Sequence, residues 1–383
     1  KMSNYQERLI DYIKSNPKFI QPEHRKNEVL GFLNQPLADL CISRPKTRLN
    51  WGIDLPFDSS YVTYVWFDAL INYITAPGFN ANNKKFDSYW PADYHLIGKD
   101  ILTTHAVYWP TMLMSAELPL PKNIFAHGWW LSGESKMSKT LGNVVDPLDL
   151  IEEYGVDPVR YYLMREMVLG QDASFTLESF IKCYNSDLAN DFGNLLSRVT
   201  NLLKKFFDSK IPLGEDESIR GKAIKDGGIY VIERVWKLIQ NMQVNEAIEE
   251  ILKYIRSVNK YMEDMAPWKL VKTDINKAGE VLYNASEALR ISSNLLKPIM
   301  PKRTLSVLKT LNAEKSNLEW GELNSGNKIK EHNQLFPRID LKKNEKKLIQ
   351  RQEKEADLVN VITFKEFLDI ELKTGKVISA EKV

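Results

Sequence analysis

The most regular hydrophobic pattern runs from about residue 177 to residue 300, where apolar side chains recur with the 3.6-residue period of an α-helix. Three apolar faces follow one another along this stretch, starting at Leu188, Val244 and Val281. An amphipathic helix buries its apolar face against a neighbour, and several such helices in succession favour an antiparallel bundle. The pattern therefore predicts a helix bundle over residues 177–315.

The first third of the chain shows a different, alternating pattern. Residues 1–40 have helical spacing, broken at Asn16-Pro17, and helical stretches farther along alternate with short apolar runs typical of strands. These runs are Tyr61–Val65, Tyr94–Ile97 and Ile124–Ala126. Alternating strands and helices predict an α/β layer.

Two helices with explicit start signals lie between these regions. Asp146-Pro147 and Asp157-Pro158 each place a carboxylate that can cap a helix before a proline that favours the first helical position. Gly155 between them is a typical helix stop. We therefore expect one helix to begin after each of the two aspartates.

The end of the chain follows a different pattern from the bundle. Residues 316–360 are rich in Lys, Glu and Asn, which predicts a linker. Residues 361–383 become apolar again, with strand-like alternation at Lys376-Val377-Ile378, as at the start of a further domain.

Composition narrows the class of protein. The 383 residues carry 52 basic and 50 acidic side chains, so the net charge of +2 neither indicates nor excludes a nucleic-acid partner. Cys41 and Cys183 have no further Cys or His at ligand spacing, which argues against a disulfide framework or a metal site. We find no apolar run suited to a membrane span and no leader, and reduced thiols fit a cytoplasmic protein. The chain opens with Lys-Met-Ser-Asn inside what reads as ordered sequence, so we expect a fragment of a longer polypeptide.

The segment Lys136-Met-Ser-Lys-Thr140 carries the sharpest chemical signal. A strand-like run over residues 127–131 and a glycine turn precede it, and Lys136 and Lys139 lie three residues apart on the loop. Two such lysines can close over a triphosphate and neutralise a departing pyrophosphate, although most lysine pairs on loops are solvated surface. The pentapeptide resembles the KMSKS signature of class I aminoacyl-tRNA synthetases, with Thr140 in place of the last serine. The resemblance implies catalytic roles for Lys136 and Lys139 and a contact between Ser138 and ATP.

A stripe of four residues, Trp66, Ala69, Leu70 and Tyr73, recurs at the spacing of one helix face. From periodicity alone, such a stripe is more often turned to the core than to a ligand. The surrounding segment is, however, similar to the methionine-pocket helix of methionyl-tRNA synthetases. Trp and Tyr walls suit a polarisable thioether, so the resemblance implies that these four residues line a methionine pocket.

The motif His95-Leu-Ile-Gly98-Lys-Asp100-Ile101 joins a strand, a glycine turn and a helix start. That order puts Asp100 at the carboxyl end of a strand, where open α/β sheets bind ligands. By resemblance to the same family, Gly98 and Asp100 approach the ribose of the adenylate, and His127 and Gly128 lie beside its adenine.

Three residues that follow this motif share one helix face. Ile101, His105 and Trp109 are spaced i, i+4 and i+8, and the resemblance implies that they complete the methionine pocket. A lone histidine on such a face would more often be a core residue with its hydrogen bonds satisfied, but here three positions match the family together.

A last constellation lies in the predicted bundle. Asn194 and Arg198 are four residues apart on the polar side of their helix, and Trp268 follows Ala266-Pro267. Such residues are often solvated surface. In methionyl-tRNA synthetases, residues at these places read the anticodon, because Trp can stack on an unpaired base while Asn and Arg bond its edges.

The resemblance covers the whole chain and implies α/β plus all-α architecture. The implied divisions are residues 1–44, the tail of a connective insertion; 45–131, the second half of a Rossmann-type catalytic domain; 132–176, the lysine loop and stem-contact helices; 177–315, the anticodon-binding helix bundle; 316–360, a linker; and 361–383, a truncated start of an OB-fold tRNA-binding domain. Class I synthetases carry a His-x-Gly-His motif, and none of the five histidines here belongs to one. The family's zinc site would precede this chain.

The implied activity is that of a methionine–tRNA ligase using methionine, ATP with Mg²⁺ and methionine tRNA, initiator and elongator alike. Without the His-x-Gly-His half, we expect the isolated chain to be inactive. Dimerisation would involve only the truncated C-terminal domain, and no membrane is implied. The alternatives are a tRNA anticodon-binding module without catalysis, a class I synthetase for another amino acid, and a nucleotidyltransferase with a similar sheet.

Overall fold

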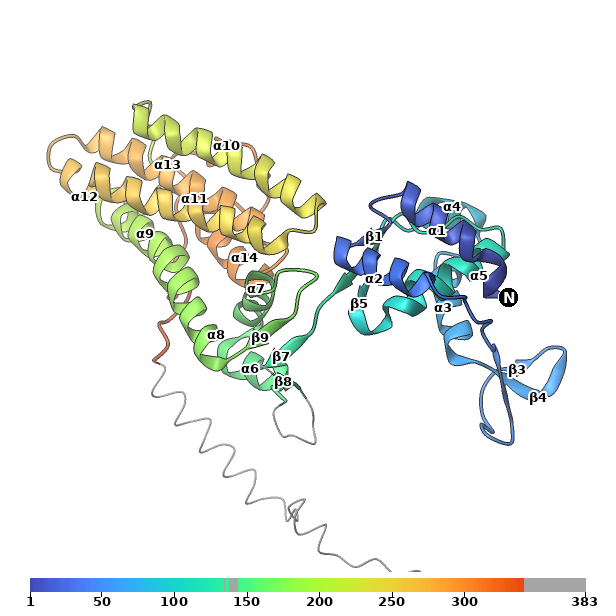
Figure 1. Ribbon diagram of the computed structural model, residues 1–383. Coiled ribbons are helices and arrows are strands. Elements are labelled where there is room, and N and C mark those ends of the chain that lie inside the picture. Colours follow the sequence, from blue (N-terminus) through green and yellow to red (C-terminus); the bar gives the residue numbers. More distant parts are fainter. Residues whose placement is uncertain (134, 138–143, 341–383) are drawn as a thin grey trace, which may run out of the picture.

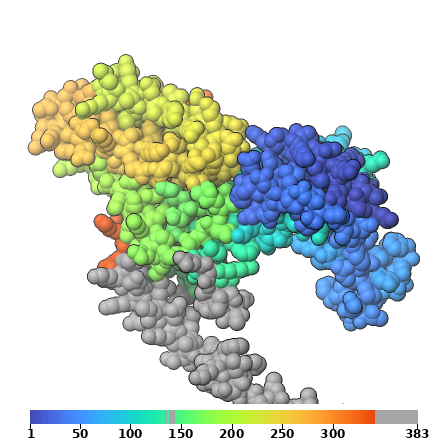
Figure 2. Space-filling view, viewed as in Figure 1, coloured from blue at the N-terminus to red at the C-terminus, as the bar shows by residue number. Residues whose placement is uncertain are grey.

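The computed structural model describes residues 1–133, 135–137 and 144–340. These residues form an α/β part and a helical part, joined by a small part that contains the strands β7, β8 and β9 (Figure 1). The two larger parts also touch directly (Figure 2). Between them, Tyr94 Oη donates a hydrogen bond of 3.4 Å to the carbonyl oxygen of Gln240. No helix in the described ranges is both long and apolar enough to cross a membrane.

The α/β part is built on a parallel sheet in the order β1-β6-β5. Its elements are η1 (Met2–Tyr5), α1 (Gln6–Ser15), β1 (Ile20–Gln21), α2 (Glu23–Leu33), α3 (Val65–Thr75), α4 (Asn83–Tyr89), β5 (His95–Gly98), η2 (Lys99–Ile101), the π-helical turn η3 (Thr104–Tyr108), α5 (Trp109–Ser115) and β6 (Ile124–His127). The central strand β6 is apolar and buried, as a parallel strand covered by helices must be. Gly98 and His127 pair directly across the carboxyl ends of β5 and β6.

The strands predicted in this part are largely confirmed. The runs at 94–97 and 124–126 match β5 and β6 to within one residue. The run at 61–65 is shifted, because β4 (Asp58–Thr63) begins three residues earlier and Val65 already opens α3. β4 is also the centre of a separate antiparallel sheet, with β2 (Ser43–Pro45) and β3 (Asp54–Leu55) as its neighbours.

The small joining part contains β7 (Trp130–Ser132), which pairs with β8 (Ser135–Lys136) and, in parallel, with β9 (Ala173–Phe175). The strand-like run at 127–131 is therefore split between β6 and β7. Two helices, α6 (Pro147–Tyr154) and α7 (Val156–Glu166), complete this part.

Of the two predicted helix starts, only the first is confirmed. The Asp146 carboxylate caps α6 by accepting the backbone N–H of Leu148 at 2.8 Å. The second is wrong, because α7 begins at Val156 with Gly155 as its N-cap. Asp157 is buried instead and accepts the backbone N–H of Arg303 at 2.5 Å, so its carboxylate fastens α7 to another helix rather than capping its own.

The helical part confirms the predicted bundle. Its elements are α8 (Leu177–Cys183), the π-helical η5 (Tyr184–Gly193), α9 (Asn194–Phe206), α10 (Ile219–Gln240), α11 (Val244–Met265), α12 (Pro267–Leu270), α13 (Ile275–Leu296) and α14 (Pro301–Thr310). The three predicted faces are buried, with Leu188, Ile255 and Leu289 at 1%, 0% and 0% exposure. The period differs from 3.6 only in η5, whose wider turns follow directly on α8.

The segment predicted as a linker packs on the bundle as far as it is described. Leu323, Ile329, Leu335 and Phe336 belong to the bundle's hydrophobic core, so residues 316–340 do not behave as a solvated connection. The prediction failed because many charged residues of this stretch surround a few apolar ones that bury. The remaining linker residues and the predicted OB-fold start at 361–383 lie outside the described residues.

A fully buried ion pair holds part of this segment. Glu287 and Arg290 on α13 lie 2.6 Å apart and are both 0% exposed. The Glu287 carboxylate also accepts the backbone N–H groups of Gly321 and Leu323, at 3.0 and 2.6 Å. Arg290 donates to the carbonyl oxygens of Asn317 and Glu319. Each charge is therefore compensated both by its partner and by the backbone of the returning segment.

Replacing one member of this pair should strongly destabilise the bundle. We expect Glu287→Ala to lower the free energy of unfolding by about 3–5 kcal/mol, because it leaves Arg290 charged and buried without its partner. Urea unfolding followed by far-UV circular dichroism measures the change. Lys222→Ala, which breaks the exposed pair with Glu217, is the control and should have little effect. Equal curves for the two variants would contradict the assignment.

Candidate functional site

The carboxyl ends of β5 and β6 bring together the residues predicted to contact the adenylate. Gly98 faces His127 across the sheet, and a Cβ at Gly98 would lie 2.6 Å from Oδ1 of Asp100. A Cβ at Gly128 would lie 2.1 Å from the carbonyl oxygen of Gln171. Gly128 is therefore required by the close approach of the Gln171 backbone, whereas a Cβ at Gly98 would displace the Asp100 carboxylate from its place beside the end of β6.

Trp129 lies at the centre of this end of the sheet. Its Nε1–H donates to Asp100 Oδ1 at 3.3 Å, and its backbone N–H donates to Asp172 Oδ1 at 2.8 Å. The ammonium groups of Lys99 and Lys136 each lie 4.2 Å from the centroid of its ring. The structure thus brings the first lysine of the predicted loop, Lys136, next to the Asp100 turn.

Two members of this cluster were missed from the sequence. Lys99 forms a 2.6 Å ion pair with Asp172, and hydrogen bonds from Lys99 and from the Trp129 backbone lower the pKa of the Asp172 carboxyl. Lys99 stands inside the Gly98–Asp100 motif and could have been singled out there. Asp172 lies in a distant loop, and nothing in its local sequence marks it. Ser138 and Lys139 lie outside the described residues.

Four of the predicted pocket residues, Trp66, Tyr73, Ile101 and His105, lie together in a second cluster. Tyr73 Oη lies 3.0 Å from Nε2 of His105, and the rings of Trp66 and His105 meet edge to face with centroids 6.1 Å apart. Nδ1 of His105 lies 3.0 Å from the carbonyl oxygen of Ile101. Because a carbonyl only accepts, Nδ1 carries the proton, and Nε2 is left to accept from Tyr73.

Trp109 is linked to this cluster through His95. Its Nε1–H donates to His95 Nε2 at 3.1 Å, and the centroids of the His95 and Tyr73 rings are 4.3 Å apart. Two of the predicted pocket residues differ from the rest of their stripe. Leu70 is buried in the core at 1% exposure, whereas Ala69 is exposed. The four-residue stripe on α3 is therefore partly buried in the core and partly exposed. Ile101 contacts the cluster through its carbonyl oxygen, which accepts from His105.

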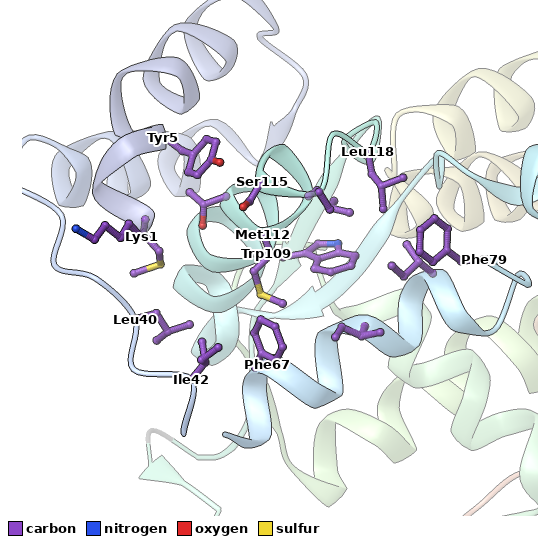
Figure 3. A pocket seen from close by; sticks show the side chains of 16 residues that line it. Lys1, Tyr5, Leu40, Ile42, Phe67, Phe79, Trp109, Met112, Ser115 and Leu118 are labelled. Atoms are coloured by element: carbon purple, nitrogen blue, oxygen red, sulfur yellow. The ribbon is translucent and has the colours of Figure 1, made fainter. Parts of the chain in front are cut away.

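A cavity of about 660 Å³ is lined by other residues of α3, among them Phe67 (Figure 3). Phe67, Met112 and Trp109 gather in it with Leu40 and Ile42 (Figure 3). Of the seven predicted pocket residues, only Trp109 lines this cavity. This cavity and the aromatic–imidazole cluster are therefore different places that share the Trp109 side chain, and the cluster has the aromatic contacts expected for a thioether.

The predicted anticodon residues lie at the far side of the bundle. The Arg198 guanidinium carbon is 5.5 Å from the centroid of Trp268, and Arg198 donates to the carbonyl and side-chain oxygens of Asn259 at 3.3 and 3.4 Å. Ala266, with φ of 44°, turns the chain from α11 into α12 and so aims Trp268 back at α9. This turn, which the sequence marks only as Ala-Pro-Trp, is what brings the two residues together.

Asn194 is exposed one turn earlier and borders a polar pocket of about 380 Å³. Its other lining residues are Ala189, Asn190, Gly193, Ser197, Gln334, Phe336 and Arg338. Gln334 and Arg338 come from the segment predicted as a linker, which is why the sequence did not identify them. Among the residues described, no three His, Cys, Asp or Glu side chains gather as metal ligands.

Two family models match the chain. One, tRNA synthetases class I (M), matches residues 1–200, and the other, the anticodon binding domain of methionyl tRNA ligase, matches residues 211–352. The chain is 43% identical over 398 residues to a methionine–tRNA ligase of Clostridium acetobutylicum and 39% identical over 414 residues to one of Bacillus subtilis. These alignments cover 100% of this chain but only 62% and 61% of the relatives, so the chain spans about 62% of the length of such relatives.

Solved structures agree with these matches. The chain is similar to Mycobacterium tuberculosis methionyl-tRNA synthetase in complex with methionyl-adenylate, with a TM-score of 0.83 and 38% identity over 88% of this chain and 68% of that one. The apo form of the same protein gives a TM-score of 0.80 and 36% identity, over 89% of this chain and 68% of that one.

His95 should titrate far below an ordinary histidine. Burial and, second, the nearby His105 lower the pKa of His95 from 6.5 to about 4. Between these values the unfolded chain binds a proton that the folded chain does not. The stability contributed by neutral His95 is therefore complete above pH 6.5 and is lost as the pH falls toward 4.

An NMR titration of the His95 ring measures this pKa directly. A midpoint near 6.5 would contradict the buried, neutral acceptor that the Trp109 hydrogen bond requires. His95→Gln, which cannot titrate but can still accept from Trp109, should flatten the acid side of the stability curve.

Proposed function

Because the chain belongs to the methionyl-tRNA synthetase family of class I tRNA synthetases, we propose that it is part of an enzyme that joins methionine to methionine tRNA. In the first step a carboxylate oxygen of methionine bonds to the α-phosphorus of ATP–Mg²⁺, and the bond from that phosphorus to pyrophosphate breaks. In the second step the terminal ribose hydroxyl of the tRNA attacks the methionyl carbonyl, and AMP leaves. Neither step needs a side-chain nucleophile, so positioning and charge neutralisation supply the catalysis.

The observation that carries this proposal is the position of Lys136 beside the Asp100 turn. Gly98 and Asp100, with His127 and Gly128, form a place for the adenosine where no Cβ intrudes. Lys136, together with Lys139 and Ser138 farther along the loop, would neutralise the pyrophosphate as it departs.

The aromatic–imidazole cluster supports methionine as the amino acid. Trp66, Tyr73 and Trp109 offer aromatic contacts to a thioether. Burial lowers the pKa of His105, which favours its neutral form. An apolar side chain that binds beside a neutral ring does not have to bury a charge. We also propose Ala69, Leu70 and Ile101 as pocket residues, with Ile101 orienting the His105 ring through its carbonyl oxygen and Leu70 packing in the core beneath the pocket.

The bundle supports tRNA as the acceptor. Arg198 and Trp268 combine a stacking surface with hydrogen-bond donors, which is how proteins specify unpaired RNA bases. With Asn194 they form the anticodon site that we assign. Initiator and elongator methionine tRNAs share this anticodon, and we propose both as partners of a cytoplasmic enzyme.

The finer features of the proposal concern the chain by itself. No His-x-Gly-His occurs among the five histidines, so one side of the triphosphate lacks the groups that the family supplies. We propose that the isolated chain is inactive, and that neither a zinc site nor a dimer contact is provided by the described residues. The second candidate function, an anticodon-binding module without catalysis, is favoured by the formed Arg198–Trp268 contact.

The isolated chain should therefore show no methionine-dependent exchange of ATP with labelled pyrophosphate. The reason is that only part of the charge of the triphosphate is neutralised by residues present here. The assay is run beside a full-length synthetase of the family as a positive control. Exchange by the chain that disappears in Lys136→Ala would contradict the expectation, whereas exchange that persists in Lys136→Ala comes from a contaminant.

Binding to the anticodon should be retained. We expect the chain to prefer a stem-loop with the anticodon CAU over the same stem-loop with CAU scrambled, at near-physiological salt. Trp268→Ala should weaken CAU binding by roughly 1–3 kcal/mol, the usual contribution of one base stacked on an aromatic ring. Fluorescence anisotropy of a labelled stem-loop measures both effects.

A matched control is Trp236→Ala, which removes an exposed tryptophan from α10 of the same bundle and should leave the preference unchanged. Equal, salt-sensitive binding of both stem-loops would show instead that the bundle attracts RNA only through its charges.

A further inference from the structure

The guanidinium group of Arg198 on α9 is contacted by residues of two other helices. Its Nη1 donates hydrogen bonds to the backbone carbonyl oxygen and to Oδ1 of Asn259 on α11, at 3.3 and 3.4 Å. Its Cζ lies 5.5 Å from the ring centroid of Trp268 on α12. Within the described part of the chain, Nε and Nη2 of Arg198 donate to no protein group, so one edge of the guanidinium stays available to a ligand.

The side-chain amide of Asn259 is itself oriented by a further contact. Its Nδ2 donates to the backbone carbonyl oxygen of Asp191 in η5 at 3.0 Å. Because a carbonyl oxygen only accepts, this bond fixes which end of the amide faces η5, and Oδ1 is left to face Arg198. The Asp191 carboxylate is engaged elsewhere, since one of its oxygens lies 3.4 Å from Nη1 of Arg256. Asn259 therefore connects the backbone of η5 with the guanidinium that α9 carries.

The contacts of Arg198 orient its charge without cancelling it. Arg198 forms no ion pair with any residue that the structure describes. Burial lowers the pKa of Arg198, and the charge of Glu263 opposes this with a smaller effect. An aspartate at position 259 would have almost the same shape as asparagine, but its carboxylate would pair with the guanidinium. The neutral amide is therefore the feature of this contact that bears on a ligand.

We propose that Asn259 is a positioning residue for RNA binding, whose amide orients the Arg198 guanidinium toward an unpaired base and, being neutral, leaves its charge available to that base. The proposal rests on the proposed function, since it takes the ligand to be the anticodon loop assigned to this part of the bundle. An arginine that is already ordered loses less side-chain freedom when it binds. Having to order such a side chain weakens binding by roughly two- to twelvefold.

Two substitutions of Asn259 separate orientation from charge, with binding of the CAU and scrambled stem-loops measured by fluorescence anisotropy on the full chain. We expect Asn259→Ala to weaken CAU binding by roughly two- to twelvefold, because Arg198 is then ordered only when the RNA binds. Asn259→Asp keeps an acceptor of the same shape and should also weaken CAU binding, because its carboxylate pairs with the guanidinium.

The dependence on salt distinguishes the two losses. Salt screens an ion pair, so the loss caused by Asn259→Asp, relative to the unmodified chain, should shrink as salt is raised, whereas the loss caused by Asn259→Ala should not. Both variants lose the bond to Asp191, so this difference reports the charge alone. Asn241→Asp, which adds the same charge at the exposed end of α10, is the control and should leave the CAU preference unchanged.

A double-mutant cycle separates positioning from general support of the fold. If Asn259 acts through Arg198, Asn259→Ala should change CAU binding little in a chain that already carries Arg198→Ala. A merely structural role would give the same loss in both backgrounds. Urea unfolding of each variant reports that the bundle is folded.

Three results would overturn this inference. These are CAU binding that Asn259→Ala leaves unchanged, CAU binding that Asn259→Asp leaves unchanged, and an equal loss from Asn259→Ala with and without Arg198. If the unmodified chain still prefers CAU and Arg198→Ala abolishes that preference, such a result contradicts the role of Asn259 and leaves the proposed function standing. No preference for CAU in the unmodified chain would contradict both.

Discussion

The parallel pairing of β5 with β6 is the constraint on which the rest of the α/β part depends. Because Gly98 lies opposite His127, the turns that leave both strands lie close together; a Cβ at 128 would meet the Gln171 backbone, and a Cβ at 98 would displace the Asp100 carboxylate. The same pairing places His95 at the start of β5, where its imidazole accepts from Trp109. One register therefore sets the carboxylate turn at one end of a four-residue strand and the aromatic–imidazole cluster at the other. A slip of one residue would turn every side chain of β5 to the opposite face and destroy both.

The bundle depends on a different kind of interaction. Its long helices pack through ordinary apolar faces, but α13 buries the Glu287–Arg290 pair in their midst. Burying two charges is costly, and a hydrophobic pair of the same size would often be at least as stable. What the charges add is selection of one partner, because Gly321, Leu323, Asn317 and Glu319 all bond to them through the backbone. The segment that returns along the bundle is thereby fixed in position, and it brings Gln334 and Arg338 to the pocket beside Asn194.

The periodicity of the sequence predicted helices and strands whose pattern lies within one segment. It failed where a side chain bonds to a group that is distant in the sequence. The helix faces around Leu188 and Leu289 and the strands at 95–98 and 124–127 follow from patterns within one element. The start at Asp157 was wrong because its carboxylate binds Arg303, far along the chain, and Gly155 takes over as the cap. The linker predicted over residues 316–360 is wrong for its described part, residues 316–340, because their few apolar side chains become buried only once α13 exists as a surface. For the site, resemblance supplied residues that composition could not, and the structure brings Trp66, Tyr73, His105 and Trp109 together. Lys99 and Asp172 stayed hidden because their pairing is made only by the fold.

Cation–π contacts with a tryptophan occur at both proposed sites. Lys99 and Lys136 lie over the ring of Trp129 beside the sheet, and Arg198 lies over the ring of Trp268 beside the bundle. In each case the indole is fixed by backbone that cannot easily move, hydrogen bonds at Trp129 and the Ala266-Pro267 turn at Trp268. The two sites differ in what else the cations bind. Lys99 is also paired with the Asp172 carboxylate, whereas Arg198 donates hydrogen bonds to the uncharged oxygens of Asn259. A ring or a neutral oxygen orients a cation without cancelling its charge. The Arg198–Trp268 contact therefore places positive charge in advance for the RNA loop proposed as its ligand, although the net charge of the chain is only +2.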